Sequence, residues 1–201
     1  DRLDLSDDTL VIFCSDNGPV LDDGYQDDAI EKIGSHRAGG PFTGGKYSVY
    51  EGGTRTPFIT HWKGRISPGV SDEVVCTIDL AGSLAALTGQ SIPSDACLDS
   101  FNVIGAMTGA KDAKGRDHLV QQDNGSNGTY ALRRGPWKLP RYGKNRSARN
   151  VVVEQQLANT KVPEFQLFNL DADPAEKTNV IEDHPDVAKQ LKAELDQIIE
   201  S

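Results

Sequence analysis

The amino-acid sequence predicts an α/β fold, in which part of a parallel sheet precedes a small antiparallel sheet with a C-terminal helix. Residues 9–14 form a continuous apolar, β-rich run, which is typical of a strand that is buried on both faces. After residue 118, short β-rich segments alternate with turns, which favours an antiparallel sheet. We therefore expect two domains: an α/β part at 1–117 and a smaller α+β part at 118–201.

The first half of the chain contains two predicted strands, a long loop and a helix. The strand at 9–14 ends in a Ser-Asp-Asn-Gly-Pro turn, and a second strand is predicted at 57–62. Residues 20–48 are polar and rich in glycine, so they are expected to form one long surface loop, and such loops are usually functional. Apolar residues recur with helical spacing over 77–87, and Gly89 provides a stop signal. Because a buried parallel strand needs neighbours, the chain is expected to begin in the middle of a sheet.

The second half contains the predicted antiparallel sheet and an amphipathic helix. Pro185 suits the first turn of a helix. The residues after it place apolar side chains on one stripe, which is expected to pack on the sheet. The stripe is formed by Val187, Leu191, Leu195, Ile198 and Ile199, and the predicted strands are 118–122, 129–133, 137–139 and 165–170.

Composition and charge exclude several classes of protein. Of the 201 residues, 37% are hydrophobic and 25% are charged, which is ordinary for a globular chain and unlike a disordered or collagen-like one. The net charge of −9 argues against nucleic acid as a partner, because phosphate backbones require a basic surface. Small anions remain compatible, since a few local cations or a bound metal can hold them. No apolar run is long enough to span a membrane.

The three cysteines are too few for a disulfide scaffold. Cys14 lies inside the first apolar run and is interpreted as a buried thiol. A disulfide between Cys76 and Cys97 is left open by their spacing.

Asp16 and Asn17 follow the first strand directly and form a candidate metal site. In open α/β sheets, ligands bind outside the carboxyl ends of the strands. A carboxylate beside an amide oxygen suits a hard cation such as Ca²⁺, although two ligands cannot complete its coordination. The alternative is that Asp-Asn-Gly is only a turn.

Lys46 lies between glycine-rich segments and is a candidate for binding an anion. The preceding Gly-x4-Gly-Lys pattern, residues 40–46, is not a nucleotide-binding P-loop, because Tyr47 replaces the required Ser or Thr and no strand precedes it. A lysine ammonium is a compact charge that suits a tetrahedral oxyanion. The alternative is a solvated lysine in a loop with structural glycines.

In their order and spacing, these segments resemble the type I sulfatases of the alkaline-phosphatase superfamily. The resemblance rests first on Ser-Asp-Asn-Gly at 15–18 and on Gly-Gly-Lys-x4-Glu-Gly-Gly-x-Arg-x-Pro at 44–57. It continues through 66–69, the predicted helix at 77–87, 132–139 and 167–179, and so covers nearly the whole chain.

The resemblance implies an alkaline-phosphatase-like fold and a calcium-dependent hydrolase of sulfate esters on aryl or carbohydrate substrates. It assigns Asp16 and Asn17 to calcium binding and Lys46 to contact with the sulfate and the bridging oxygen. It also favours a periplasmic or secreted protein. His36 and Arg37, in the loop before Lys46, are weaker candidates for substrate binding.

The sequence departs from the family at the nucleophile. Sulfatases use a formylglycine made from Cys or Ser in a Cys/Ser-x-Pro/Ala-x-Arg motif. That motif is absent here, because Ser91-Ile-Pro-Ser-Asp95 carries Asp where Arg is required. We therefore expect the chain to be the carboxy-terminal portion of a sulfatase, inactive alone, with the formylglycine in a missing N-terminal half as its partner.

Two other functions are compatible with the sequence. The chain could be a non-catalytic module that binds calcium or a sulfated glycan. It could also be a phosphatase-like relative, although such sites use more histidines, and His61, His118 and His184 are interpreted as structural or surface groups.

A basic stretch without acidic residues, 124–153, is a further candidate for holding a sulfated polymer. Arg133, Trp137 and Lys138 within it are expected rather to pack or pair. The better candidates are Arg141, Lys144, Arg146 and Arg149.

Overall fold

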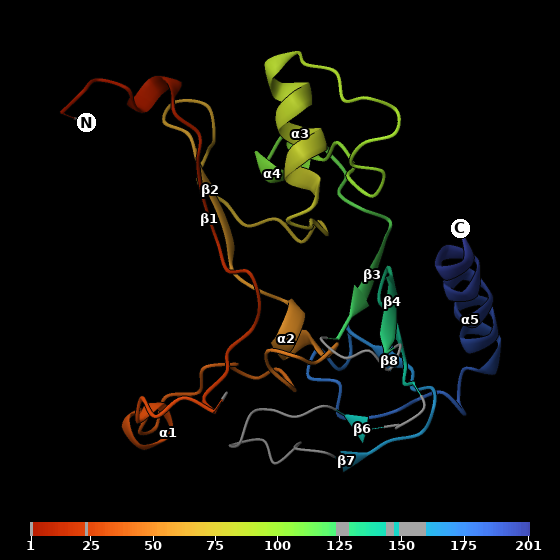
Figure 1. Cartoon of the computed structure of the whole chain (residues 1–201). Helices are drawn as coiled ribbons and strands as arrows, with labels where there is room; N and C mark the ends of the chain where they lie inside the picture. The colour runs from red at the N-terminus through yellow and green to blue at the C-terminus, as the bar shows by residue number, and fades with distance from the viewer. Residues whose placement is uncertain (1, 23, 124–128, 144–146, 149–159) are drawn as a thin grey trace. The chain divides into compact units, whose positions relative to one another are not determined.

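The computed structural model of the chain describes residues 2–22, 24–123, 129–143, 147–148 and 160–201. These residues belong to two compact units (Figure 1). Unit 1 comprises Asp1–Asp16 and Pro57–Asp117, and unit 2 comprises Asn17–Thr56 and His118–Ser201.

Unit 1 contains a two-stranded sheet and two helices. Strand β1 (Val11–Cys14) pairs antiparallel with β2 (Phe58–His61), and a 3₁₀ turn, η1 (Ser6–Asp8), precedes β1. Helix α3 (Asp79–Thr88) ends at Gly89, whose φ of 69° is the left-handed conformation that glycine allows at helix ends. Helix α4 (Ile104–Met107) follows. The predicted strands and the helix are confirmed.

The prediction of a buried parallel strand at the start of the chain is wrong. Strand β1 pairs antiparallel, and the side chains of Val11 and Phe13 are 50% and 63% exposed. The reason is that, among the described residues, β1 is hydrogen-bonded to β2 alone. Strand β2 is in turn bonded to the segment that follows α3, since Thr60 Oγ1 donates to Met107 O at 2.6 Å. The Cys14 thiol is consequently exposed rather than buried.

Asp79 holds three segments of unit 1 together. It is fully buried, and its carboxylate accepts hydrogen bonds from the backbone N–H groups of Cys76 and Phe101 at 3.0 and 2.9 Å. It also forms an ion pair of 2.6 Å with Arg116, whose guanidinium lies 4.1 Å from the ring centroid of Phe101. A buried charge that is paired and hydrogen-bonded in this way is stable, whereas an unpaired one is not.

Unit 2 is built on a four-stranded antiparallel sheet, a kind of sheet that the sequence predicts, and its strand order is β3-β4-β5-β8. A second pair of short strands, a long helix and two single-turn helices complete it. The strands are β3 (His118–Gln122), β4 (Tyr130–Arg134), β5 (Trp137–Arg141), β6 (Ser147–Ala148), β7 (Thr160–Lys161) and β8 (Phe168–Asn169), and the helices are α1 (Ala29–Lys32), α2 (Glu51–Thr54) and α5 (Pro185–Glu200).

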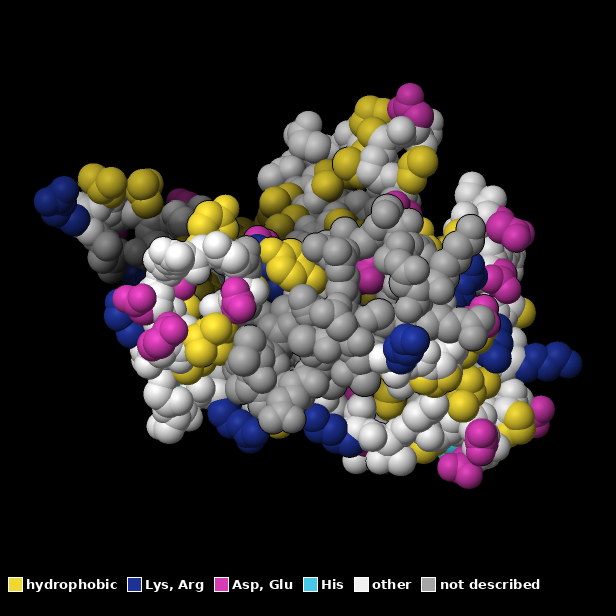
Figure 2. Space-filling model, turned by 60° about the horizontal axis from the view of Figure 1, so that its bottom comes forward, with side chains coloured by type: hydrophobic (Ala, Val, Ile, Leu, Met, Phe, Trp, Pro, Cys, Tyr) yellow, Lys and Arg dark blue, Asp and Glu magenta, His cyan; other side chains and the backbone are white. Residues whose placement is uncertain are grey.

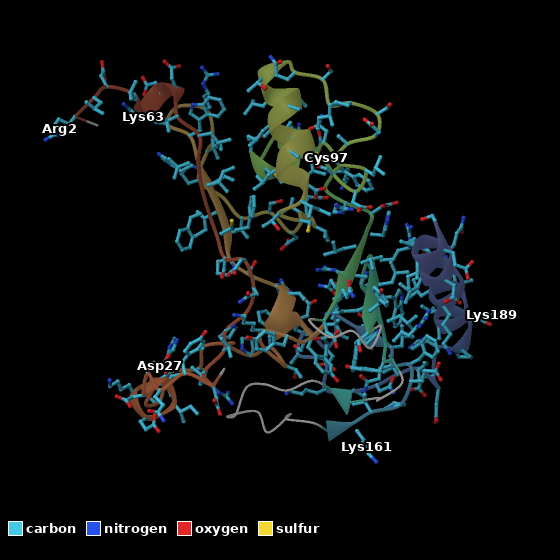
Figure 3. The ribbon with its side chains drawn as sticks, viewed as in Figure 1. Arg2, Asp27, Lys63, Cys97, Lys161 and Lys189 are labelled. Atoms are coloured by element: carbon cyan, nitrogen blue, oxygen red, sulfur yellow. The ribbon has the colours of Figure 1, made fainter. Side chains whose placement is uncertain are left out.

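One face of this sheet packs against α5. The apolar stripe predicted for the helix is confirmed, since Leu191 and Leu195 are buried against Leu132 and Leu139 of the sheet. Lys189, on the opposite side of the helix, points away from the sheet (Figure 3). Ion pairs flank the apolar contact: Arg134 with Glu194, and Arg141 with Asp196 at 2.7 Å. His184 is structural, as expected, because its ring lies 4.8 Å from that of Trp137.

The other face of the sheet carries cations. Successive side chains of a strand alternate between faces, and Arg133 pairs in register with Lys138. Both therefore point away from α5, toward α2. Gln121 of β3 lies on the same face, and its Nε2 donates to Thr54 Oγ1 of α2 at 2.6 Å.

The cysteines form no disulfide. Cys14, Cys76 and Cys97 are all free thiols, so the pairing left open by the sequence does not occur; Cys97 is labelled in Figure 3. Within the described ranges, no helix combines the length and the apolar character needed to cross a membrane. On the face drawn in Figure 2, the described acidic and basic side chains are interspersed.

Candidate functional site

Lys46 and the turn after Asn17 are joined by their backbones. The N–H of Lys46 donates a hydrogen bond to Pro19 O at 2.8 Å. One residue earlier in that turn, the N–H of Gly18 donates to Gly53 O at 2.9 Å. The Lys46 loop (residues 43–50) and the turn are thus held side by side in unit 2.

Glycines make this close approach possible. A Cβ added to Gly18 would lie 1.8 Å from Gly52 O, and one added to Gly53 would lie 2.3 Å from Gly45 O. Backbone atoms at these distances cannot move aside cheaply. Gly18 and the Gly52-Gly53 pair are therefore explained by backbone-to-backbone packing, whereas Gly44 has a φ of 79°, which glycine readily adopts.

The Lys46 side chain is half-buried and rests near an aromatic ring. Its Nζ lies 5.1 Å from the ring centroid of Tyr47, a distance at which a cation and a π face attract each other. Tyr47 has a φ of 77°, in the left-handed region that residues other than glycine rarely adopt. Backbone strain of this kind clusters at functional sites. The assignment of Lys46 to sulfate binding stays a prediction.

The predicted calcium ligands lie at the junction of the two units along the chain. Asp16 is exposed, and Asn17 is half-buried and donates its Nδ2–H to Gly18 O at 2.9 Å. A carboxylate and an amide oxygen are donors that Ca²⁺ accepts, so the residues fit the ion in kind and supply part of its coordination. Among the residues that the structure describes, no group of three or more His, Cys, Asp and Glu side chains is arranged to hold a metal. The calcium site stays a prediction.

His36 and Arg37 lie just after α1, and both are exposed. Their backbones form turns, in which the N–H of His36 donates to Ile33 O at 3.1 Å and Arg37 O accepts from Gly40 N–H at 2.9 Å. Their assignment to substrate binding stays a prediction.

The basic stretch is only partly described. Arg141 forms the ion pair with Asp196, and Arg133 and Lys138 point toward α2, so the expected pairing of the latter two is confirmed. The remaining candidates for holding a sulfated polymer, Lys144, Arg146 and Arg149, lie outside the described residues.

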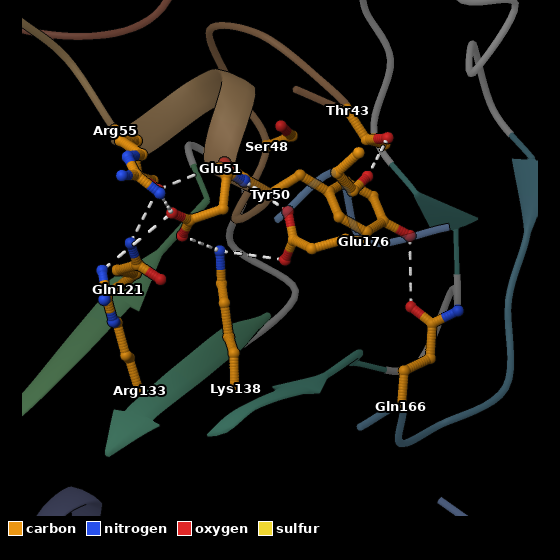
Figure 4. Close-up of polar contacts among 12 residues, drawn as sticks. Thr43, Ser48, Tyr50, Glu51, Arg55, Gln121, Arg133, Lys138, Gln166 and Glu176 are labelled. Carbon is orange, nitrogen blue, oxygen red and sulfur yellow. Dashed lines mark hydrogen bonds and ion pairs between the residues drawn. The ribbon is translucent and has the colours of Figure 1, made fainter. Parts of the chain in front are cut away.

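Glu51, Lys138 and Glu176 form a buried cluster of charges (Figure 4). Their exposed fractions are 1%, 0% and 4%. Lys138 Nζ lies 2.9 Å from Glu51 Oε1 and 3.0 Å from Glu176 Oε1. The backbone N–H of Glu51 also donates to Glu176 Oε2 at 2.5 Å. The cluster ties together α2, β5 and the turn after β8.

The pKa values of the two carboxyl groups of the cluster are shifted in opposite directions. Burial raises the pKa of Glu51, but the charge and hydrogen bond of Lys138, assisted by Arg133 and Arg55, outweigh burial and bring it below its ordinary value of 4.5. For Glu176, burial outweighs the charge of Lys138, and the pKa is raised above 4.5. Glu51 is therefore the more firmly ionised partner of Lys138.

Further bonds anchor both ends of the Lys46 loop. Thr43 Oγ1 donates to Ala175 O at 2.5 Å, at the beginning of the loop. Tyr50 OH donates to Gln166 Oε1 at 3.1 Å, at its end. Burial raises the pKa of Tyr50, so the hydroxyl keeps its proton and acts as a donor.

Sequence reasoning did not identify the charge cluster as a unit. Glu51, Lys138 and Glu176 all lie inside the segments that carry the family resemblance, but those segments are far apart in the chain. The available signal was an ionisable residue inside each of three segments that otherwise read as structural.

Comparisons with known proteins identify sulfatases as relatives of this chain. The family model described as Sulfatase matches residues 1–90. The chain is 42% identical over 198 residues to the N-acetylgalactosamine-6-O-sulfatase of Bacteroides thetaiotaomicron, an alignment that covers 98% of this chain and 38% of that relative. It is 29% identical over 187 residues to arylsulfatase A of Homo sapiens, covering 89% of this chain and 34% of the relative.

Solved structures give the same result. A sulfatase of Bacteroides thetaiotaomicron, solved in work on the metabolism of multiple glycosaminoglycans, matches the whole chain with a TM-score of 0.86 and 39% identity. The match covers 40% of that protein.

The relatives and the fold define the class: the chain belongs to the sulfatase family and has the alkaline-phosphatase-like fold that its motifs predict. Within the family, it is similar to the Bacteroides N-acetylgalactosamine-6-O-sulfatase and spans 38% of that relative's length.

Proposed function

We propose that the chain is the carboxy-terminal part of a calcium-dependent sulfatase that hydrolyses a 6-O-sulfate ester of N-acetylgalactosamine in a glycan. One observation supports this most strongly: the backbone of Lys46 is bonded to the turn that follows Asn17. The residue assigned to the sulfate and one assigned to the metal are thereby neighbours. The sugar is inferred from the printed name of the Bacteroides relative.

Lys46 stabilises negative charge in this proposal. When the S–O bond of a sulfate ester breaks, charge develops on the bridging oxygen and on the sulfate oxygens. An ammonium fixed beside those atoms stabilises the transition state more than the ground state, because the charge grows as the bond breaks. The close backbone packing around the loop keeps the ammonium in place before the substrate arrives, so little reorganisation is needed.

Asp16 and Asn17 hold the metal in this proposal, together with ligands from outside this chain. Calcium, when bound, supplies positive charge that offsets the charge of the sulfate. The two residues contribute one anionic and one neutral oxygen, which leaves room for further carboxylates in a coordination shell of roughly six to eight oxygens. An acidic chain can bind an anionic substrate through such a local concentration of positive charge.

The nucleophile is assigned to the rest of the enzyme. The sequence lacks the Cys/Ser-x-Pro/Ala-x-Arg motif from which sulfatases make formylglycine. The chain spans little more than a third of its relatives' length, so there is ample room for the motif elsewhere. We therefore expect the 201-residue chain alone to be inert toward sulfate esters, because a positioned lysine cannot replace covalent catalysis.

The test uses the complete enzyme, meaning the natural reading frame that contains this sequence. We expect it to release sulfate from 6-O-sulfated N-acetylgalactosamine, more slowly from the 4-O-sulfated isomer, and to lose activity when Ca²⁺ is chelated. A reading frame without the nucleophile motif, or a complete protein that binds sulfated glycan but releases no sulfate, would overturn the proposal in favour of a binding module.

A further inference from the structure

The cluster of Glu51, Lys138 and Glu176 joins the four-stranded sheet to the candidate site. Lys138 is fully buried on the face of the sheet that meets α2. Glu51 is the first residue of α2, and both its side chain and its backbone N–H are held by the cluster (Figure 4). Because all three groups are buried, they do not meet a substrate themselves. Any effect that they have on catalysis must pass through α2.

Helix α2 is hydrogen-bonded both to the Lys46 loop and to the turn after Asn17. The N–H of Gly52 donates to Thr43 O at 2.8 Å, and Gly53 O accepts from Gly18 N–H at 2.9 Å. Both glycines lie so close to the neighbouring backbone that a Cβ on either would overlap a carbonyl oxygen. Segments that are packed this tightly move together, so a shift of α2 also displaces the loop that carries Lys46.

Stability alone is a weak reason for this cluster. Taking charges out of water is costly, and a buried ion pair can often be replaced by apolar residues without loss of stability. What charge-assisted hydrogen bonds do provide is defined distances and directions. A misplacement of about 1 Å at a reacting group can cost on the order of 100-fold in rate.

We propose that Lys138 is a positioning residue: it holds Lys46 and the turn after Asn17 in the geometry for catalysis, through its bonds to Glu51 and Glu176. This inference rests on the proposed function, since Lys46 is the group whose position matters.

The first measurement compares two variants of the complete enzyme. Lys138→Met removes the charge and keeps most of the volume. Arg134→Met is the matched control, since it removes a cation from the neighbouring strand and breaks an ion pair with Glu194, but on the face that meets α5. We expect Lys138→Met to lower kcat/KM by about 10-fold or more and Arg134→Met by less than about twofold. Equal losses in both variants would overturn the proposal.

The second measurement separates positioning from structure by combining variants. If Lys138 acts through Lys46, then Lys138→Met has almost no further effect once Lys46→Ala has removed the ammonium. A merely structural role predicts the same fractional loss in both backgrounds. If the fold-losses in kcat/KM of the two single variants multiply in the double variant, the proposal is contradicted, whatever the effect of each single change.

The third measurement does not depend on activity. We expect Lys138→Met to accelerate hydrogen exchange at the amides of Lys46 and Gly52, while Arg134→Met leaves them protected. Unchanged exchange would overturn the positioning role even if the enzyme's substrate proves different, and accelerated exchange would support it in an enzyme that hydrolyses no sulfate ester.

If Lys138→Met does not fold, a second variant tests the proposal. The triple change Lys138→Met, Glu51→Gln and Glu176→Gln leaves no unpaired charge buried. We expect it to fold and to show the same loss of protection and of kcat/KM. A triple variant with native exchange and activity would show that the charges do not position the loop.

Discussion

The backbone N–H of Lys46 lies 2.8 Å from the carbonyl oxygen of Pro19, and this hydrogen bond joins two segments that sequence reasoning could connect only through a family resemblance. It brings the lysine assigned to sulfate beside the turn that follows Asn17. The bond depends on glycines at the points of contact, because the neighbouring carbonyl oxygens leave no room for a side chain. The first prediction tests that dependence.

Gly18→Ala is expected to be harmful. The new Cβ would overlap Gly52 O, at 1.8 Å, and would push the turn away from α2. We expect a loss of stability of about 1–3 kcal/mol, typical of overpacking, together with a loss of activity in the complete enzyme. Gly69→Ala is the control, since no atom lies within 4 Å of a Cβ there. Thermal unfolding and kcat/KM measure both variants, and equal behaviour would disprove the close packing at Gly18.

The two glutamates of the buried cluster are expected to affect the pH dependence of stability with opposite signs. The pKa of Glu51 in the folded chain lies below its ordinary value of 4.5. Its contribution to stability is therefore present above pH 4.5 and is lost as the pH falls through the folded pKa. The pKa of Glu176 is raised. Its contribution is present below pH 4.5 and is lost as the pH rises through the folded pKa.

Urea unfolding of Glu51→Gln and Glu176→Gln over a range of about pH 3.5–7 measures this difference. As the pH falls, the free energy of unfolding of Glu51→Gln should approach that of the unchanged chain. Glu176→Gln should become relatively more stable as the pH rises. Curves that run parallel to that of the unchanged chain would show that neither carboxyl group titrates as inferred.

Asp79→Ala should destabilise unit 1 strongly. The change removes the carboxylate that pairs with the buried Arg116 side chain and accepts from the backbone N–H groups of Cys76 and Phe101. Breaking a buried ion pair from one side costs about 3–5 kcal/mol. Asp72→Ala, an exposed position in the same unit, should change stability by less than about 0.5 kcal/mol. Similar unfolding free energies for the two variants would contradict the structural role of Asp79.

Calcium should bind weakly or not at all to the 201-residue chain alone. Asp16 and Asn17 provide two oxygens, which leaves most of the coordination to water. Titration calorimetry of the chain and of Asp16→Ala tests this. Tight binding that Asp16→Ala abolishes would mean that this chain contains further ligands, with Asp22 as the first candidate.

Much of the fold could be predicted from local patterns. The helix after Pro185 and the strand at 118–122 were predicted because each repeats its own period over several turns or residues. The exposure of Phe13 could not be predicted, because a continuous apolar run does not reveal which segment pairs with it or what covers its faces.

The site could be predicted only in part. Lys46 is predicted as an anion-binding residue from its glycine-rich surroundings, and two of those glycines, Gly52 and Gly53, pack against neighbouring backbone. The cluster of Glu51, Lys138 and Glu176 could not be predicted as a unit, because only the tertiary fold brings Glu51 and Glu176 to Lys138. Pairings between distant segments leave no periodic trace in the sequence.

The central claim, that Lys46 stabilises the transition state of sulfate ester hydrolysis, is tested most directly by kcat/KM of the complete enzyme with Lys46→Ala. Lys32→Ala is the control, because Lys32 is an exposed lysine paired with Asp28 on α1. We expect Lys46→Ala to lower kcat/KM by on the order of 100-fold or more, as for loss of one oxyanion-stabilising donor, and Lys32→Ala to leave it unchanged. An unchanged kcat/KM in Lys46→Ala would contradict the account.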